Sequence, residues 1–232
     1  MNAPTQPTTR AVFFDIDFTL IHPGPAFQGT GYKAFCSRFG IDVDPAAFDS
    51  AVEAAGTVLD PGSGEYDAQV YVDYTRRIIE GMGGRGPDIE TAAREIYNEW
   101  AACHHFFLYD DVSDVLRGLY ARGLKIGLIS NSHRCLTSFQ SHFLLEGLFA
   151  AAVSSAEHGY MKPHPSIFES ALRLASAEPR ESVMVGDSVT HDVEGARRLG
   201  MRAVLVSRTG RAEACPPDVP VIRTLRELPA LL

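Results

Sequence analysis

The sequence predicts an α/β fold in which a parallel sheet is covered by helices on both faces. Short apolar runs recur along the chain, and segments with helical periodicity lie between them. Four of these runs are expected to be buried strands, at residues 11–15, 124–130, 183–187 and 203–207. Such alternation with short connections is typical of a parallel sheet, whose ligands bind at the carboxyl ends of the strands.

Helices between the strands are expected where apolar residues repeat three or four positions apart. They fall at residues 112–119, ahead of Gly123, at residues 168–175, behind Pro165, and at residues 193–199. The proline at the start and the glycine beyond the end are typical helix boundaries.

One long stretch breaks the alternation. Between Ile21 and Leu108 no buried strand is expected, and four helical patterns are separated by loops that contain glycine and proline. We therefore expect a flexible N-terminal tail over residues 1–10, a core domain formed by residues 11–22 and 108–232, and a helical domain inserted over residues 23–107. Glycines near the entry to the insert, Gly24, Gly29 and Gly31, are expected to act as a hinge because glycine accepts wide backbone angles.

Charge and composition indicate which classes of molecule the protein is not expected to bind. The 232 residues carry 21 basic and 29 acidic side chains, and a net charge of −8 disfavours binding to nucleic acid or to anionic membranes. The longest apolar runs are far shorter than the roughly 20 residues of a membrane helix. The four cysteines are dispersed and form no C-x-x-C pair, so a cytoplasmic location is expected. The sequence carries no signal for the oligomeric state.

Two carboxylates stand where the first strand is expected to end, at Asp15 and Asp17. Past the end of a strand, one can aim at a substrate and the other at its leaving group, which suits a nucleophile paired with an acid/base. Taken alone, the D-x-D-x-T pattern fits an acidic turn equally well.

Three further polar elements follow in order. Ser130 and Asn131 end the second core strand with groups able to hold a phosphoryl oxygen. Lys162 places one cation immediately before a helix. Asp187 and Asp192 follow a third strand, and carboxylates of this kind suit an oxygen-only Mg²⁺ site.

With these four motifs in this order, the sequence resembles the haloacid dehalogenase-like (HAD) hydrolase superfamily, and within it the phosphatase branch with a helical (C1-type) cap. The resemblance covers the chain from Ala11 onward, and the segments Met161–Phe168 and Val185–Gly200 are its most specific parts. It implies a Rossmann-like core, with the cap inserted after the first strand.

The resemblance also implies a role for each catalytic and substrate-binding residue. Asp15 would be the nucleophile that forms an aspartyl-phosphate, and Asp17 the acid/base. Ser130 and Asn131 would hold phosphoryl oxygens. Lys162 would neutralise the charge that builds up when a carboxylate attacks an anionic phosphate.

The implied cofactor is Mg²⁺. Its ligands would be the Asp15 carboxylate, the Asp17 backbone carbonyl and Asp187, with Asp192 as an auxiliary ligand. Thr19 is assigned to the substrate-binding loop, which it would support.

The implied function is Mg²⁺-dependent hydrolysis of a small phosphomonoester. A 2-haloacid dehalogenase would use the same nucleophile without a metal or a second acid, and Asp17 argues against it. A sugar-phosphate mutase shares the motifs. A non-catalytic phosphate-binding module is disfavoured because every catalytic position is filled, and a phosphonate hydrolase would need a cap lysine, for which Lys33 is the sole candidate.

Several other residues have less specific interpretations. His104 and His105 are adjacent, so we expect them to point to different sides of a helix and not to share a metal ion. His133 and Arg134 either reach the mouth of the pocket or begin a solvated helix. Phe18, where many members of the family carry glycine, is expected to pack under the cap in preference to narrowing the pocket.

Overall fold

The computed structural model describes residues 8–59, 64–210 and 214–232. Within it the chain divides into two compact units. One is formed by the residues up to His22 together with Leu108–Leu232, and the other by Pro23–Phe107. In the described parts of the chain, every helix is too short or too polar to span a bilayer.

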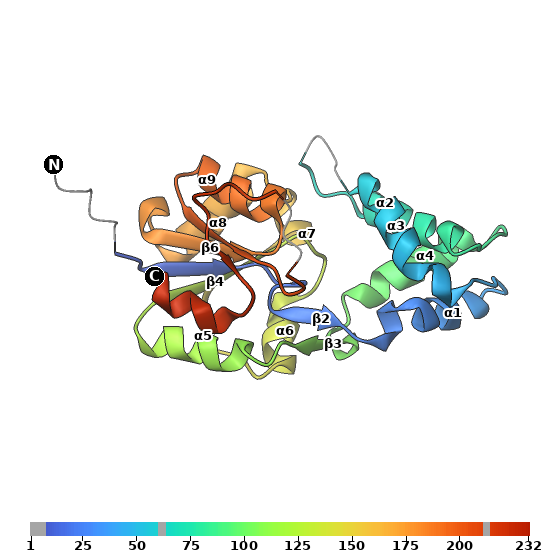
Figure 1. The fold of residues 1–232 in the computed structure, drawn as a ribbon, viewed down its shortest axis with the longest axis horizontal. Coiled ribbons are helices and arrows are strands. Elements are labelled where there is room, and N and C mark those ends of the chain that lie inside the picture. Colours follow the sequence, from blue (N-terminus) through green and yellow to red (C-terminus); the bar gives the residue numbers. More distant parts are fainter. Residues whose placement is uncertain (1–7, 60–63, 211–213) are drawn as a thin grey trace. The chain divides into compact units, whose positions relative to one another are not determined.

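The first unit is built on a six-stranded parallel sheet with the strand order β5-β4-β1-β6-β7-β8 (Figure 1). The strands are β1 (Ala11–Phe14), β4 (Lys125–Ser130), β5 (Phe149–Ser154), β6 (Ser182–Gly186), β7 (Arg202–Val206) and β8 (Val221–Ile222). The predicted α/β class with a parallel, Rossmann-like sheet is confirmed. Because β1 pairs with both β4 and β6, the carboxyl ends of these three strands lie next to one another.

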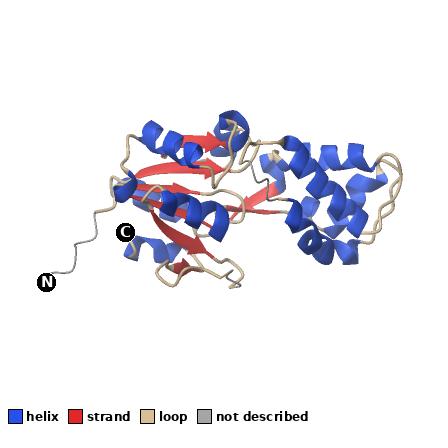
Figure 2. Cartoon of the chain, turned by 90° about the horizontal axis from the view of Figure 1, so that it is seen from above, coloured by secondary structure: helices blue, strands red, loops and turns tan. Residues whose placement is uncertain are grey.

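Helices cover both faces of this sheet (Figure 2), with α8 and α9 on one face and α5 on the other (Figure 1). The helices are α5 (Val112–Ala121), α6 (Leu136–His142), α7 (Ser155–His158), α8 (Pro165–Ala175) and α9 (Gly195–Arg198), with a π-helical segment at Val189–Glu194. Phe13, Ile129 and Met184 of the strands pack with Ile167 and Phe168 of α8, and all five are fully buried. Each such side chain contributes about 1.5–3 kcal/mol on burial, so this cluster fixes α8 to the strands that carry the polar motifs.

The chain joins the sheet before β1 begins. Thr9 is buried, the Arg10 amide donates to the Glu181 carbonyl, and the Arg10 carbonyl accepts from the Lys125 amide. Thr9 and Arg10 therefore belong to the sheet and not to the flexible tail expected over residues 1–10. Residues 1–7 of that tail lie outside the described residues.

Among its described residues the second unit contains four α-helices, the number of helical patterns expected between Ile21 and Leu108. They are α1 (Gly29–Ser37), α2 (Phe48–Ala55), α3 (Ala68–Gly81) and α4 (Ile89–Trp100). Asp44 caps the turn that leads into α2 by accepting a hydrogen bond from the Ala46 amide at 2.9 Å, as its position before Pro45 predicts.

Two short strands, β2 (Ile21–Pro23) and β3 (Phe106–Leu108), pair where the chain passes between the units. Nearby, Gly29 and Gly31 lie within α1. A Cβ atom at Gly29 would lie 2.2 Å from the Pro45 carbonyl oxygen, and one at Gly31 would lie 2.1 Å from that of Ala26. These glycines permit close backbone packing, so the predicted hinge is wrong at these two positions.

Candidate active site

Strand β1 delivers two carboxylates to the carboxyl edge of the sheet. The Asp15 amide donates to the Val185 carbonyl of β6 at 2.9 Å, which continues the sheet pairing as far as Asp15. Beyond it the chain turns, and the Phe18 amide donates to the Ile21 carbonyl at 2.7 Å. Phe18 adopts a φ of 62° in the left-handed region that favours glycine, and its side chain is 44% exposed. Asp15 itself is buried, so burial acts directly on its charge.

Lys162 is the buried cation of the site. Its Nζ lies 2.5 Å from Asp15 Oδ1 and 2.6 Å from Asp192 Oδ1, and its side chain is 2% exposed. Burial alone would lower the pKa of Lys162, but the two carboxylates outweigh burial and raise it. Lys162 is therefore held as an ammonium between two acids.

Asn131 holds the backbone of the segment that carries this lysine. Its side-chain oxygen accepts from the Lys162 amide at 2.7 Å, and its side-chain nitrogen donates to the Lys162 carbonyl at 2.9 Å. Ser130, at the end of β4, is buried and donates to the Ser132 hydroxyl at 3.0 Å. Both residues lie at the predicted edge of the sheet, and Asn131 is engaged in positioning Lys162.

Three carboxylates converge at this edge. Asp15, Asp187 and Asp192 each offer one oxygen, and these atoms all lie within 4.8 Å of one another. Asp192 lies on the π-helical segment, and its Oδ2 accepts from the Ser188 amide at 3.1 Å. A Cβ atom at Gly186 would lie only 2.1 Å from Asp192 Oδ2, so glycine at this position lets the carboxylate approach β6.

The site has more negative than positive charge. Burial raises the pKa of Asp15 to about 7; Asp192 and Asp17 act in the same direction, and Lys162 opposes them. Burial, with Asp15 and Asp192, raises the pKa of Asp187 to about 8. One ammonium does not balance three carboxylates, two of them buried, so the cluster favours an additional cation. A donor set made only of carboxylate oxygens fits a hard ion such as Mg²⁺.

A family comparison agrees with this geometry. A model of the haloacid dehalogenase-like hydrolases matches residues 9–200, which include β1, β4, β6 and all four motifs. The chain belongs to the haloacid dehalogenase-like hydrolase family. The predicted family is thereby confirmed.

Known members of the family resemble the chain over nearly all of its length. Glyceraldehyde 3-phosphate phosphatase of Methanothermobacter thermautotrophicus is 28% identical over 240 residues, covering 96% of this chain and 99% of that protein. A HAD phosphatase from Thermococcus onnurineus has 26% identity and a TM-score of 0.65, covering 96% and 97%. A 2-haloacid dehalogenase from Pseudomonas syringae, at 23% identity, 97% and 98% coverage and a TM-score of 0.65, shares the fold. The phosphatase relatives support the predicted enzyme class.

In this HAD-like hydrolase the loop after β1 is anchored by Arg208, a residue that the sequence analysis did not identify. Its guanidinium donates to the Thr19 carbonyl at 2.7 Å and to Asp111 Oδ2 at 2.6 Å. Thr19 and Asp111 are fully buried. The role of Thr19 in supporting the loop stays a prediction.

Arg134 is a second residue that the sequence analysis underestimated. Its side chain is fully buried, and its Nη2 donates to Asp17 Oδ1 at 2.9 Å. The interpretation of Arg134 as part of a solvated helix start is therefore wrong, since α6 begins only at Leu136. Its one signal in the sequence is its place just after Ser130 and Asn131, on the loop that leaves the carboxyl end of β4.

Proposed function

We propose that this chain hydrolyses a small phosphomonoester through an aspartyl-phosphate formed on Asp15. The observation that carries the proposal is the convergence of Asp15, Asp187 and Asp192 within 4.8 Å, with Lys162 bridging Asp15 and Asp192. A buried carboxylate beside a buried ammonium suits attack on an anionic phosphorus centre, because the ammonium offsets the repulsion between nucleophile and substrate.

In the first step an Asp15 carboxylate oxygen forms a bond to phosphorus, and the bond from phosphorus to the leaving oxygen breaks. Asp17, in its acid form, gives its proton to that oxygen, so the product leaves as an alcohol. Lys162 holds its ammonium against Asp15 throughout. Ser130 is assigned to the phosphoryl oxygens, and Asn131 to the same role and to holding the Lys162 backbone.

In the second step Asp17, now a carboxylate, takes a proton from water. The water oxygen bonds to phosphorus, and the acyl-phosphate bond breaks to release phosphate and restore the Asp15 carboxylate. Arg134 supports this role by fixing the position of Asp17 from a buried site.

Mg²⁺ fits the donor set and would be held by Asp15, Asp187 and the Asp17 backbone carbonyl, with Asp192 as the auxiliary ligand. When bound, it would supply the positive charge that the three carboxylates lack and stabilise charge on the transferred phosphoryl group. Relatives named as phosphatases support a small phosphorylated substrate. We also assign the helical unit as the cap, because it is inserted after β1 and its described residues are mainly helical.

A chelator experiment tests the proposal. Purified protein should release phosphate from p-nitrophenyl phosphate in Mg²⁺, stop in excess EDTA, and recover when Mg²⁺ is restored. Turnover that persists in excess EDTA, or chloride release from 2-chloropropionate at a comparable rate, would favour a dehalogenase. Transfer of phosphate between sugar positions without net release would favour a mutase, and phosphate binding without turnover would favour a binding module.

A further inference from the structure

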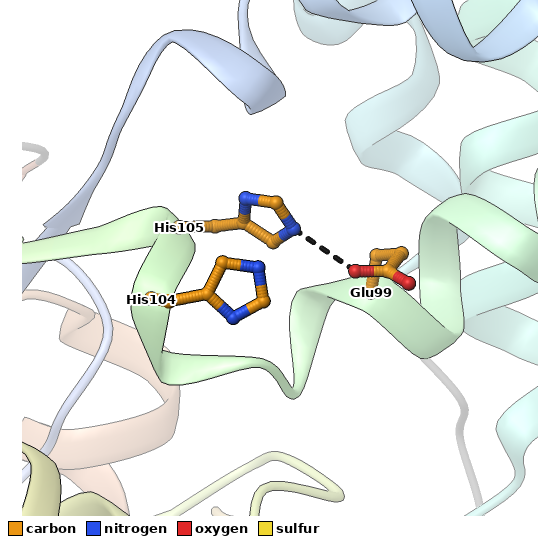
Figure 3. A group of neighbouring side chains, drawn as sticks. All are labelled: Glu99, His104 and His105. Atoms are coloured by element: carbon orange, nitrogen blue, oxygen red, sulfur yellow. Dashed lines mark hydrogen bonds and ion pairs between the residues drawn. The ribbon is translucent and has the colours of Figure 1, made fainter.

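The helical unit contains a second group of residues that can hold a metal ion. Glu99, His104 and His105 each offer one ligand atom, and these three atoms lie within 4.8 Å of one another. Figure 3 shows both imidazole rings on the same side of the chain, toward the Glu99 carboxylate. We refer to these three residues as the His–Glu cluster.

The local backbone explains how two adjacent histidines come to share one side. Helix α4 ends at Trp100, and the chain then forms a tight turn over Cys103–His105. In this turn the two rings lie with their centroids 4.0 Å apart and their planes inclined by 43°. The expectation that His104 and His105 cannot share a metal, which assumed a regular helix, is therefore wrong.

His105 is held in place from several directions. Its amide donates to the Ala102 carbonyl at 3.2 Å, and its carbonyl accepts from the Gly24 amide at 2.7 Å. Its Nε2 lies 2.9 Å from Glu99 Oε2, and the Phe27 ring meets it edge-on at 5.4 Å. His105 and Glu99 thus form a preorganised pair, whereas His104 is exposed and free to adjust its ring.

We propose that the His–Glu cluster binds a transition-metal cation of the Zn²⁺ class. Two imidazoles and one carboxylate are ligands that Zn²⁺ accepts, and three protein ligands leave a fourth position for water. Ligand atoms around tetrahedral Zn²⁺ lie about 3.3 Å apart, which rotation of the exposed His104 ring can achieve from the present spacing. Mg²⁺ prefers oxygen ligands in octahedral geometry, so the cluster differs in selectivity from the carboxylate site on the core.

A bound ion would join two segments of the chain, the end of α4 and the turn that precedes β3. Glu99 belongs to the last turn of α4, and His104 and His105 immediately precede β3, through which the chain leaves the helical unit. The ion would replace one hydrogen bond with three coordinate bonds. We therefore expect it to stabilise this return segment.

Cobalt(II) provides a direct test, because its visible d–d absorption reports nitrogen-containing sites of low coordination number. The full-length protein, stripped of metal and supplied with excess Mg²⁺ to occupy oxygen sites, is titrated with Co²⁺. We expect one equivalent to give a visible band that Zn²⁺ displaces. His104→Ala and Glu99→Gln should each weaken Co²⁺ binding at least tenfold, while His142→Ala, at an exposed histidine on α6, should leave it unchanged.

The proposal fails if the wild type gives no visible band, or if His104→Ala and Glu99→Gln bind Co²⁺ as the wild type does. Loss of the band in Asp187→Asn, with the band retained in His104→Ala, would place the ion in the carboxylate site and also overturn it. Circular dichroism of each variant shows whether it is folded. Because His104 is exposed, its replacement is expected to keep the fold.

Discussion

At the scale of single residues, two buried cations, Lys162 and Arg134, form ion pairs with the aspartates of the site. Lys162 pairs with Asp15 and Asp192, and Arg134 pairs with Asp17. Both cations are buried, so each interacts with its partner in a medium that screens charge weakly. The two aspartates of the D-x-D motif are therefore held by different cations and are expected to tolerate replacement differently.

Asp17→Asn should impair hydrolysis in a way that depends on the leaving group. The amide cannot give a proton to the leaving oxygen, and loss of general acid catalysis typically costs about 10²–10⁴-fold. We expect the larger loss for an alkyl phosphate and the smaller loss for p-nitrophenyl phosphate, whose leaving group is stable without a proton. Steady-state kinetics on both substrates tests this, and an equal loss for both would contradict the acid role.

Arg134→Lys should lower kcat with little change in KM. The shorter, differently shaped cation cannot hold Asp17 in the same place, and a misplacement of about 1 Å can cost about 10²-fold. Replacement of the exposed Arg180 by Lys serves as the matched control. A variant with wild-type kcat would show that the Arg134–Asp17 pair is structural only.

At the scale of elements, the loop after β1 and the segment after β3 are anchored to the carboxyl side of the sheet by one buried ion pair. Arg208, which follows β7, contacts the Thr19 carbonyl and Asp111. Asp111 Oδ2 also accepts hydrogen bonds from the Thr224 hydroxyl and the Leu225 amide, at 2.6 Å and 2.7 Å. Three separate segments of the core therefore meet at this carboxylate, and Arg208 links a fourth, the loop that holds Thr19.

Asp111→Asn should destabilise the protein by about 3–5 kcal/mol at neutral pH, since it leaves the Arg208 charge without its partner. Burial alone would raise the pKa of Asp111, but hydrogen bonds from Arg208, Thr224 and Leu225 lower it below its ordinary value. The stabilisation is thus fully present above the ordinary pKa and is lost as the pH falls through the lowered one. Urea unfolding measured from pH 7 to acid pH should show that the difference in free energy of unfolding between Asp111→Asn and wild type shrinks below about pH 4.

The matched control for this experiment is Asp110→Asn, because the Asp110 side chain is 85% exposed. Its replacement should change stability little at any pH. An Asp111→Asn difference that stays constant down to strongly acid pH would contradict the assignment of a lowered pKa to Asp111.

At the scale of the whole molecule, sequence patterns predicted four strands of the sheet and the polar groups at their ends. Strand β5 was missed because three consecutive alanines, Ala150, Ala151 and Ala152, give neither a strongly apolar run nor β-branched side chains. Contacts between distant segments were also missed. Arg134 meets Asp17 across 117 positions of the chain, and neither residue carries a local sign of the other.

The excess of negative charge at the carboxylate cluster should make the stability of the whole protein depend on pH. Asp15 and Asp187 have raised pKa values, about 7 and about 8, so the native state binds protons that the unfolded state has already lost. Without divalent cations, this site should therefore lower stability as the pH rises from about 4 to about 8.

Mg²⁺ should raise the melting temperature, and by more at pH 8 than at pH 6, because at the lower pH it competes with protons. Asp187→Asn should reduce both the pH effect and the Mg²⁺ effect. Calorimetry in EDTA and in Mg²⁺ at the two pH values measures this. A Mg²⁺ effect that is equal at both pH values would contradict the predicted coupling between cation and protons.

The central claim is that Asp15 carries the phosphoryl group during turnover, and trapping the acyl-phosphate tests it most directly. Enzyme quenched during hydrolysis of p-nitrophenyl phosphate is treated with borohydride, which reduces an aspartyl-phosphate to homoserine, and the peptide containing residue 15 is sequenced by mass spectrometry. We predict homoserine at position 15 only when both substrate and Mg²⁺ are present. Unmodified Asp15 in enzyme that is turning over, or reduction at Asp17 in its place, would contradict the account.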